Sequence, residues 1–221
     1  MKHIILSDEI KQACPNFVGA MLCADIRNSA YSEELWKEIG EFQIKYRETY
    51  TTESIKCMPS IQATREAYKR CGKDPSRYRP SGEALVRRIL KGTDLYKVDT
   101  TVDLINLASI AFGYSIGGFD EDRIVGDTLT LGIGREGEPY EGIGRGPINI
   151  GGLPVYRDQI GGIGTPTSDH ERTKLSTDTK HLLVIVNGYD GNKKQVLACA
   201  QFIEALCQKY AEATNTSITT F

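Results

Sequence analysis

GYSIGGFD, at residues 113–120, marks the point where the composition of the chain changes. Of the 22 glycines in the chain, 15 lie between residues 113 and 164, where short β-branched segments alternate with turn residues. Glycine weakens a helix interior by about 1 kcal/mol relative to alanine, whereas tight turns favour it. The stretch therefore predicts that a helix-rich first half gives way to a β-rich second half.

Upstream of this stretch, the apolar spacing is mostly that of helices. Ser32 caps a predicted long helix in which Leu35, Ile39, Phe42 and Tyr46 recur at helical spacing and form one buried stripe. Short strands are expected at residues 2–6 and 16–26, around a short helix that Ser7 caps and Pro15 ends. Further helices are expected from Pro59 to Gly72, from a Ser81 cap to Gly92, and from a cap at Thr100 or Thr101 to Gly113.

Downstream, the same patterns predict strands at residues 128–131, 147–150, 154–156 and 182–186, then a helix over 193–213. The class is α+β (mixed α/β), with the helix-rich N-terminal half packed on a glycine-rich β-sheet half. Because no linker or low-complexity block interrupts the chain, one domain over residues 1–221 is expected. Its C-terminal helix lies at 191–213, and its tail at 214–221 frays or adds an edge strand.

Composition and charge exclude several classes of protein. The chain has 221 residues, of which 40% are hydrophobic and 25% charged, as in soluble globular proteins. The net charge of −2 means that RNA binding requires a local basic patch, and DNA binding is not expected. The sequence shows no signal-peptide core or membrane segment, and its six cysteines form no CxxC pair. We therefore expect a reduced cytoplasmic protein with no membrane partner, no metal and no cofactor.

Two motifs that often carry chemistry have ordinary structural interpretations here. GIGREG (residues 132–137) matches the dinucleotide-binding pattern, but a second glycine turn at 142–146 follows it where a helix should begin. Two glycine turns in series, with no helix between them, indicate loops between β-strands. Among three histidines, His170 lies in the polar stretch TSDHER (residues 167–172) and is the candidate general base. A solvated loop histidine is the alternative.

A basic segment occupies residues 65–91, where nine Lys and Arg residues accompany three acidic ones. Arg77-Tyr78-Arg79 places an aromatic ring between two guanidinium groups, a combination that suits phosphate contact and base stacking. The alternative is the solvated face of a helix. The candidate RNA-binding residues are Lys69, Arg70, Lys73, Arg77, Tyr78, Arg79, Arg87 and Arg88.

Two glycine pairs need a reason, because successive residues without side chains let a ligand or another backbone come close. They are Gly117-Gly118 and Gly161-Gly162, both in the β-rich half. Tight turns explain such pairs equally well. The functional interpretation is a pocket floor made by two glycine loops.

Several segments resemble a known module in order along residues 13–188. They are CPNFVG (14–19), VDLINL (102–107), GYSIGGFD (113–120), EGE (136–138), GGIG (161–164) and the strand that begins near Asp178. Together they resemble the B3/B4 tRNA-editing module of the bacterial phenylalanyl-tRNA synthetase β subunit and, more narrowly, the free-standing (solo) B3/4 domain family. The resemblance implies a B3/B4-like mixed α/β fold of packed sheets.

In that synthetase, the module removes a wrong amino acid, tyrosine, from the phenylalanine tRNA by hydrolysing the aminoacyl ester. The resemblance implies a substrate pocket built from Gly117, Gly118, Phe119, Asp120, Gly161, Gly162 and Thr165. The chain departs from the pattern at three positions: Gly117 stands where the family has a histidine, and Asn16 and Ala20 stand where it has arginines. His170, in a loop at 165–171 that the module does not share, could restore the missing polar group.

Two functions therefore remain open. One is a trans-acting aminoacyl-tRNA hydrolase with the basic segment contacting tRNA, and the other is a non-catalytic tRNA- or amino-acid-binding module with the same fold. A small-molecule binder without RNA contact is a third. Length and missing aminoacylation motifs exclude a complete ligase.

Overall fold

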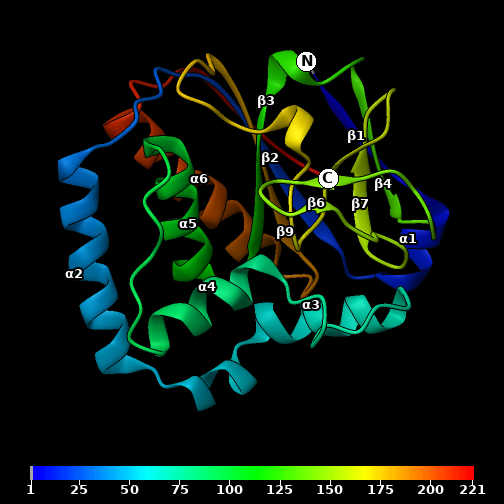
Figure 1. The fold of residues 1–221 in the computed structure, drawn as a ribbon, viewed down its shortest axis with the longest axis horizontal. Helices are drawn as coiled ribbons and strands as arrows, with labels where there is room; N and C mark the ends of the chain where they lie inside the picture. The colour runs from blue at the N-terminus through cyan, green and yellow to red at the C-terminus, as the bar shows by residue number, and fades with distance from the viewer. Residues whose placement is uncertain (1) are drawn as a thin grey trace.

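The computed structural model describes residues 2–221 and arranges them in three layers (Figure 1). Helices cover one face of a four-stranded middle sheet, and a second four-stranded sheet covers the other face. The predicted α+β class is confirmed. Met1, the first residue of the predicted domain, lies outside the described residues.

The middle sheet has the order β10-β2-β9-β3, and all its pairs are antiparallel. Its strands are β2 (Val18–Asp25), β3 (Ser115–Asp120), β9 (His181–Gly188) and β10 (Thr214–Thr220). The two central strands, β2 and β9, are covered on both faces, so their sequences are nearly continuous apolar runs instead of alternating patterns. The glycine-containing strand β3 is left at one edge.

The second sheet has the order β1-β4-β7-β8 and faces the middle sheet. Its strands are β1 (His3–Leu6), β4 (Thr128–Ile133), β7 (Pro154–Arg157) and β8 (Gly162–Gly164), and β1 runs parallel to β4. A small hairpin of β5 (Glu141–Gly142) and β6 (Gly146–Pro147) stands beside it. Leu129 and Leu131 of β4 pack against Leu183 and Ile185 of β9, forming the core between the sheets.

Six α-helices and three short 3-10 helices complete the part of the chain that the structure describes. They are α1 (Asp8–Ala13), α2 (Glu33–Thr49), η1 (Thr52–Cys57), α3 (Pro59–Arg70), α4 (Ser81–Leu90), α5 (Thr100–Phe112), η2 (Glu121–Arg123), η3 (Glu171–Thr173) and α6 (Lys193–Tyr210). Ser7 and Ser32 cap α1 and α2 as predicted, since their hydroxyl groups accept bonds from backbone amides one turn later.

Two predicted caps are wrong. Ser81 is already the first residue of α4, after Pro80. Thr100 and Thr101 likewise lie inside α5, whose cap is Asp99: this carboxylate accepts a bond from Val102 N at 2.8 Å. A cap must have extended backbone just before the helix, which both threonines lack.

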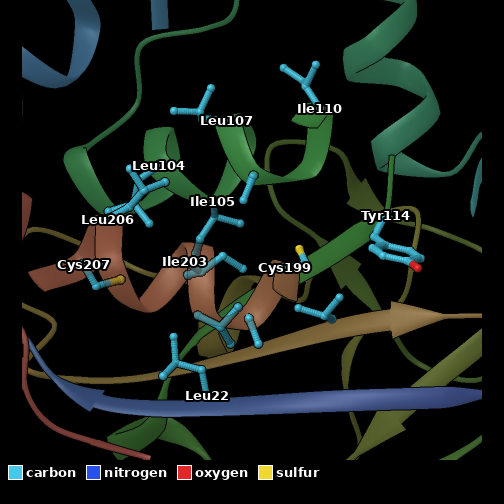
Figure 2. Close-up of a cluster of buried hydrophobic side chains, with 14 of the residues drawn as sticks. Leu22, Leu104, Ile105, Leu107, Ile110, Tyr114, Cys199, Ile203, Leu206 and Cys207 are labelled. Carbon is cyan, nitrogen blue, oxygen red and sulfur yellow. The ribbon is translucent and has the colours of Figure 1, made fainter. Parts of the chain in front are cut away.

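The larger core lies between the helices and the middle sheet (Figure 2). Leu22 of β2 and Ile203 of α6 point into the space between α5, α6 and the sheet, while Leu107 and Ile110 point from α5 toward the outer helices. The helix α5 is thus apolar nearly all round, because it has neighbours on several sides.

The buried stripe of α2 differs from the prediction at one position. Leu35, Ile39 and Tyr46 are buried, but Phe42 is half-buried and Gln43 lies inside instead. The side-chain oxygen of Gln43 accepts a bond from Leu95 N at 2.9 Å, which satisfies the buried amide of an extended segment. The apolar pattern could not reveal this polar contact.

The strand predicted at 147–150 is also wrong, because only Pro147 belongs to a strand. Beyond it the chain turns, and Ile150 packs inward against Tyr68 and Tyr140. The amine of Lys73 donates to the carbonyl oxygens of Asn149 and Gly151 at 2.9 and 2.7 Å. These bonds give the carbonyl groups of the turn the partners that a neighbouring strand would otherwise supply.

The tail at 214–221 adds an edge strand, β10, which pairs with β2. Among residues 2–221, no helix combines the length and the apolar character needed to cross a bilayer.

Replacing the buried Ile39 by alanine tests the role of the α2 stripe. Ile39→Ala should lower the free energy of unfolding by about 2–5 kcal/mol, because it leaves a cavity in the core. Ile44→Ala is the matched control on the same helix, since this side chain is 56% exposed. It should change stability by less than about 0.5 kcal/mol. Equal losses of stability for the two variants, measured by urea unfolding, would contradict the assignment of Ile39 to the buried stripe.

Candidate functional site

A cavity of about 420 Å³ lies beside the outer edge of β3, between that strand, α5 and the segment that follows β8. A single β-bridge, from Phe119 to Lys174, pairs this edge. Six aliphatic side chains form most of its wall, together with a glycine and three polar residues. They are Val98, Val102, Ile105, Ile116, Ile143 and Leu175, with Gly118, Asn106, Asp169 and Lys174. Volume and lining are those of a small-molecule site: mostly apolar walls with a few polar groups.

Asp169 is held at the cavity wall by its backbone. Its carbonyl oxygen accepts a bond from Ile143 N at 3.1 Å, and it forms a β-bridge with Gly164. Its side-chain Oδ2 accepts a bond from the amide of Gly118 at 3.3 Å. That amide belongs to the edge strand β3, so the carboxyl group occupies the place where a further strand would pair.

Glycines make room for this carboxyl group. A methyl group added to Gly164 would come within 2.9 Å of Asp169 Oδ1, and one added to Gly117 within 3.4 Å. Both would also approach the ring of Phe119 to 2.5–2.6 Å. A histidine at 117, as in the resembling module, would therefore compete with Asp169 for the same space.

Burial raises the pKa of the Asp169 carboxyl group to about 8, and the bond from Gly118 N opposes only part of this shift. The cationic group of the same cavity, Lys174, forms its ion pair with Glu171. Asp169 is thus a largely protonated acid at neutral pH, in a wall that is mostly aliphatic.

The structure brings only one of the predicted pocket residues, Gly118, to the cavity wall. The ring of Phe119 points into the core between the sheets, and Asp120 accepts a bond from Thr179. Gly161 ends the turn between β7 and β8, and Gly162 begins β8, where a methyl group on it would meet Tyr140. Of the two glycine loops, only the one on β3 forms a pocket floor.

Thr165 and His170 have structural roles in the loop that carries Asp169. The Thr165 hydroxyl donates to the carbonyl of Ser168 at 2.9 Å and closes a turn. His170 Nδ1 accepts a bond from Arg172 N at 3.0 Å, and its ring packs edge-on against Tyr140. Burial lowers the pKa of His170.

The sequence analysis missed Asp169. The available signal is that it lies in the polar stretch TSDHER (residues 167–172) and is the one acidic residue between Asp158 and Glu171. Its contact with Gly118 joins positions 51 residues apart, which local patterns cannot reveal.

The basic segment contains both exposed and half-buried side chains, and several of them pair with groups of the protein. Lys69, Arg70, Arg77 and Arg79 are exposed. Arg88 donates to the carbonyl of Asp94 and lies over the ring of Tyr96.

Lys73 lies elsewhere than the charge pattern predicts: it is 7% exposed, and its amine holds the turn at 149–151. The ring of Tyr78 lies 3.7 Å from the same amine. One face of this ring is therefore occupied within the protein.

Three arginines surround a single buried acid at the start of α4. The Glu83 carboxylate is inaccessible to solvent and lies 2.9 Å from Arg65, 2.7 Å from Arg87 and 3.8 Å from Arg79. One negative charge thus orders three positive ones, which leaves this corner with an excess of two positive charges.

The loop that carries Asp169 is tied to the basic loop. Thr167 Oγ1 donates to the carbonyl of Tyr78 at 3.3 Å, and Ser81 N donates to the carbonyl of Pro166 at 2.7 Å. The backbone of Tyr78, which lies between Arg77 and Arg79, therefore contacts the loop that leads, two residues later, into the cavity wall.

Residues 2–221 contain no group of three or more His, Cys, Asp or Glu side chains placed to hold a metal ion.

A family model described as B3/4 domain matches residues 63–214, which include most of α3, all of α4–α6, the cavity and the basic segment. The match spans more than half of the chain, and the chain therefore belongs to the B3/4 domain family. The family expected from the sequence motifs is confirmed.

Among solved structures, the chain is similar to an N-terminal fragment of the phenylalanyl-tRNA synthetase β-subunit from Pyrococcus horikoshii. The identity is 14% and the TM-score 0.48, over 97% of this chain and 49% of that chain. The chain thus spans about half the length of that structure. No curated protein matches the chain.

Removing the charge of Glu83 tests the arginine cluster. Glu83→Gln should lower the free energy of unfolding by about 2–4 kcal/mol, because three guanidinium groups then lose their buried counterion. Glu66→Gln removes an equally short pair with Lys69, but both side chains are 56% exposed. It should leave the unfolding midpoint unchanged, because solvent screens this pair. A Glu83 variant as stable as the wild type would rule out the proposed ordering role.

Proposed function

We propose that the protein binds aminoacyl-tRNA and hydrolyses the ester that joins the amino acid to the tRNA. The observation that carries this proposal is the aliphatic cavity with one carboxyl group at the open edge of β3. A hydrophobic amino-acid side chain fits such a wall, because burying it removes apolar surface from water. Membership of the B3/4 domain family supports the same substrate class.

The reaction needs a water molecule to attack the ester carbonyl carbon. The bond between that carbon and the terminal ribose oxygen then breaks, and the ribose oxygen takes up a proton. The neighbouring hydroxyl group of the same ribose can orient the water. The cavity therefore has to hold the aminoacyl group in place and exclude its other conformations. In this proposal the protein contributes positioning and no covalent nucleophile.

The engagement of His170 favours a second candidate, a binding module without catalysis. Its Nδ1 accepts a backbone bond and its ring packs on Tyr140, so the predicted general base is held in the structure of the loop. In this second case, the same cavity would hold an amino acid or aminoacyl-tRNA without turnover.

The exposed basic residues supply the proposed contact with tRNA. Arg77 and Arg79 flank Tyr78 on a loop that is hydrogen-bonded to the loop carrying Asp169. A phosphate backbone bound there would lie beside the elements that form the cavity wall. Such contacts give affinity that falls steeply with salt.

Filling the cavity tests the pocket. Gly118→Val should reduce deacylation of a panel of mischarged tRNAs, including Tyr-tRNA(Phe), at least tenfold. The added atoms would come within about 3 Å of Ile105 and Leu175 and occupy the space of the substrate side chain. Rates are measured with radiolabelled aminoacyl-tRNA.

Gly40→Val is the control, because a side chain there meets open space on α2. It should deacylate at the wild-type rate. A loss confined to Gly161→Val would instead favour the pocket predicted from the sequence. Absence of turnover with every tRNA, together with retained tRNA binding, would favour the binding module.

Charge reversal tests the RNA contact. Arg77→Glu combined with Arg79→Glu should weaken tRNA binding at least tenfold at low salt and make it less dependent on salt, because phosphate contacts are lost. Lys37→Glu combined with Lys45→Glu gives the same change in net charge on α2, far from this loop (Figure 1). Filter binding over a range of salt concentrations measures both. Equal effects would assign the binding to net charge alone.

A further inference from the structure

One side chain in the cavity wall, that of Asp169, is not explained by its contacts within the fold. Within residues 2–221, the side chain of Asp169 has a single hydrogen-bond partner, the amide of Gly118 at 3.3 Å. Asp169 lines the cavity, and its Oδ1 lies where methyl groups on Gly117 and Gly164 would come within 3.4 and 2.9 Å of it. Placing a carboxyl group in an aliphatic wall costs free energy unless it is paired, so packing alone does not explain this residue.

The surrounding groups define what could pair with it. Lys174 reaches the same cavity, but its amine pairs with Glu171. Asn106, also in the wall, is uncharged. The other titratable neighbours are Tyr140, whose pKa Asp169 helps to raise, and His170, whose pKa burial lowers. A ligand that carries a positive charge beside an apolar chain would therefore satisfy both the carboxyl group and the wall.

We propose that Asp169 binds the α-ammonium group of a hydrophobic amino acid or aminoacyl ester whose side chain fills the cavity. This inference rests on the proposed function and narrows it to substrates with a free amino group. N-acylated amino acids, which carry no charge at this position, would be rejected. The residue positions the aminoacyl group and takes no part in breaking the ester bond.

Binding of such a cation has a measurable proton balance. The free carboxyl group is mostly protonated at pH 7, because burial raises its pKa to about 8. An ammonium group within hydrogen-bond distance favours the carboxylate and lowers this pKa. The complex therefore forms with release of most of one proton to the buffer.

The test is titration calorimetry with L-leucinamide and N-acetyl-L-leucinamide at pH 7, in two buffers of different ionisation enthalpy. The wild-type protein should bind leucinamide at least tenfold more tightly than the acetylated compound, and with proton release. Asp169→Asn keeps the shape of the side chain but cannot become an anion. It should lose both the preference and the proton release.

A merely structural Asp169 would weaken both compounds together in the Asn variant and leave proton release unchanged. Comparison of the two compounds on the wild-type protein is independent of whether that variant folds. Equal binding of the two, or no binding of either up to millimolar concentrations, would overturn the inference. Deacylation by the wild type alongside either result would show that the inference has failed while the proposed function holds.

Discussion

The antiparallel pairing of β9 with β2 on one side and β3 on the other is the constraint on which the rest of the structure depends. Side chains from β2 and β9 point alternately into the helix-covered core and into the core between the sheets. Neither the helical layer nor the second sheet could bury its apolar face without these strands. The cavity exists because this sheet ends at β3 on one side, where a loop replaces the next strand.

That replacement gives the candidate site its chemistry. A regular strand beside β3 would satisfy the edge with backbone carbonyl groups, whereas here the side chain of Asp169 accepts the bond from Gly118. This arrangement interrupts the regular pairing of the sheet and places a titratable group at the edge of β3. Glycines at 117 and 164 are required on both sides of it, since a larger residue would displace the carboxyl group or the ring of Phe119.

Much of the fold could be predicted from local patterns, because its helices repeat their apolar residues with a clear period and its central strands are short apolar runs. The long helix that follows Ser32 and the strand predicted at 128–131, observed as Thr128–Ile133, are examples. The caps and turns were harder to predict. Asp99 rather than a threonine caps α5, and Lys73 holds a turn by hydrogen bonds instead of forming part of a charged surface. Of the site, only Gly118 could be predicted. Asp169 was missed because its role comes from contacts between segments distant in the sequence.

The parallel pairing of β1 with β4 has a consequence for how the protein folds. His3 lies opposite Thr128, and Thr220 of β10 lies opposite Ala20, so both sheets need strands that are far apart in the chain. Closing such long loops costs entropy before any contact compensates for it, which slows folding. The helices of residues 33–112 can form earlier from local contacts, so the sheet core that supports the cavity would be completed last.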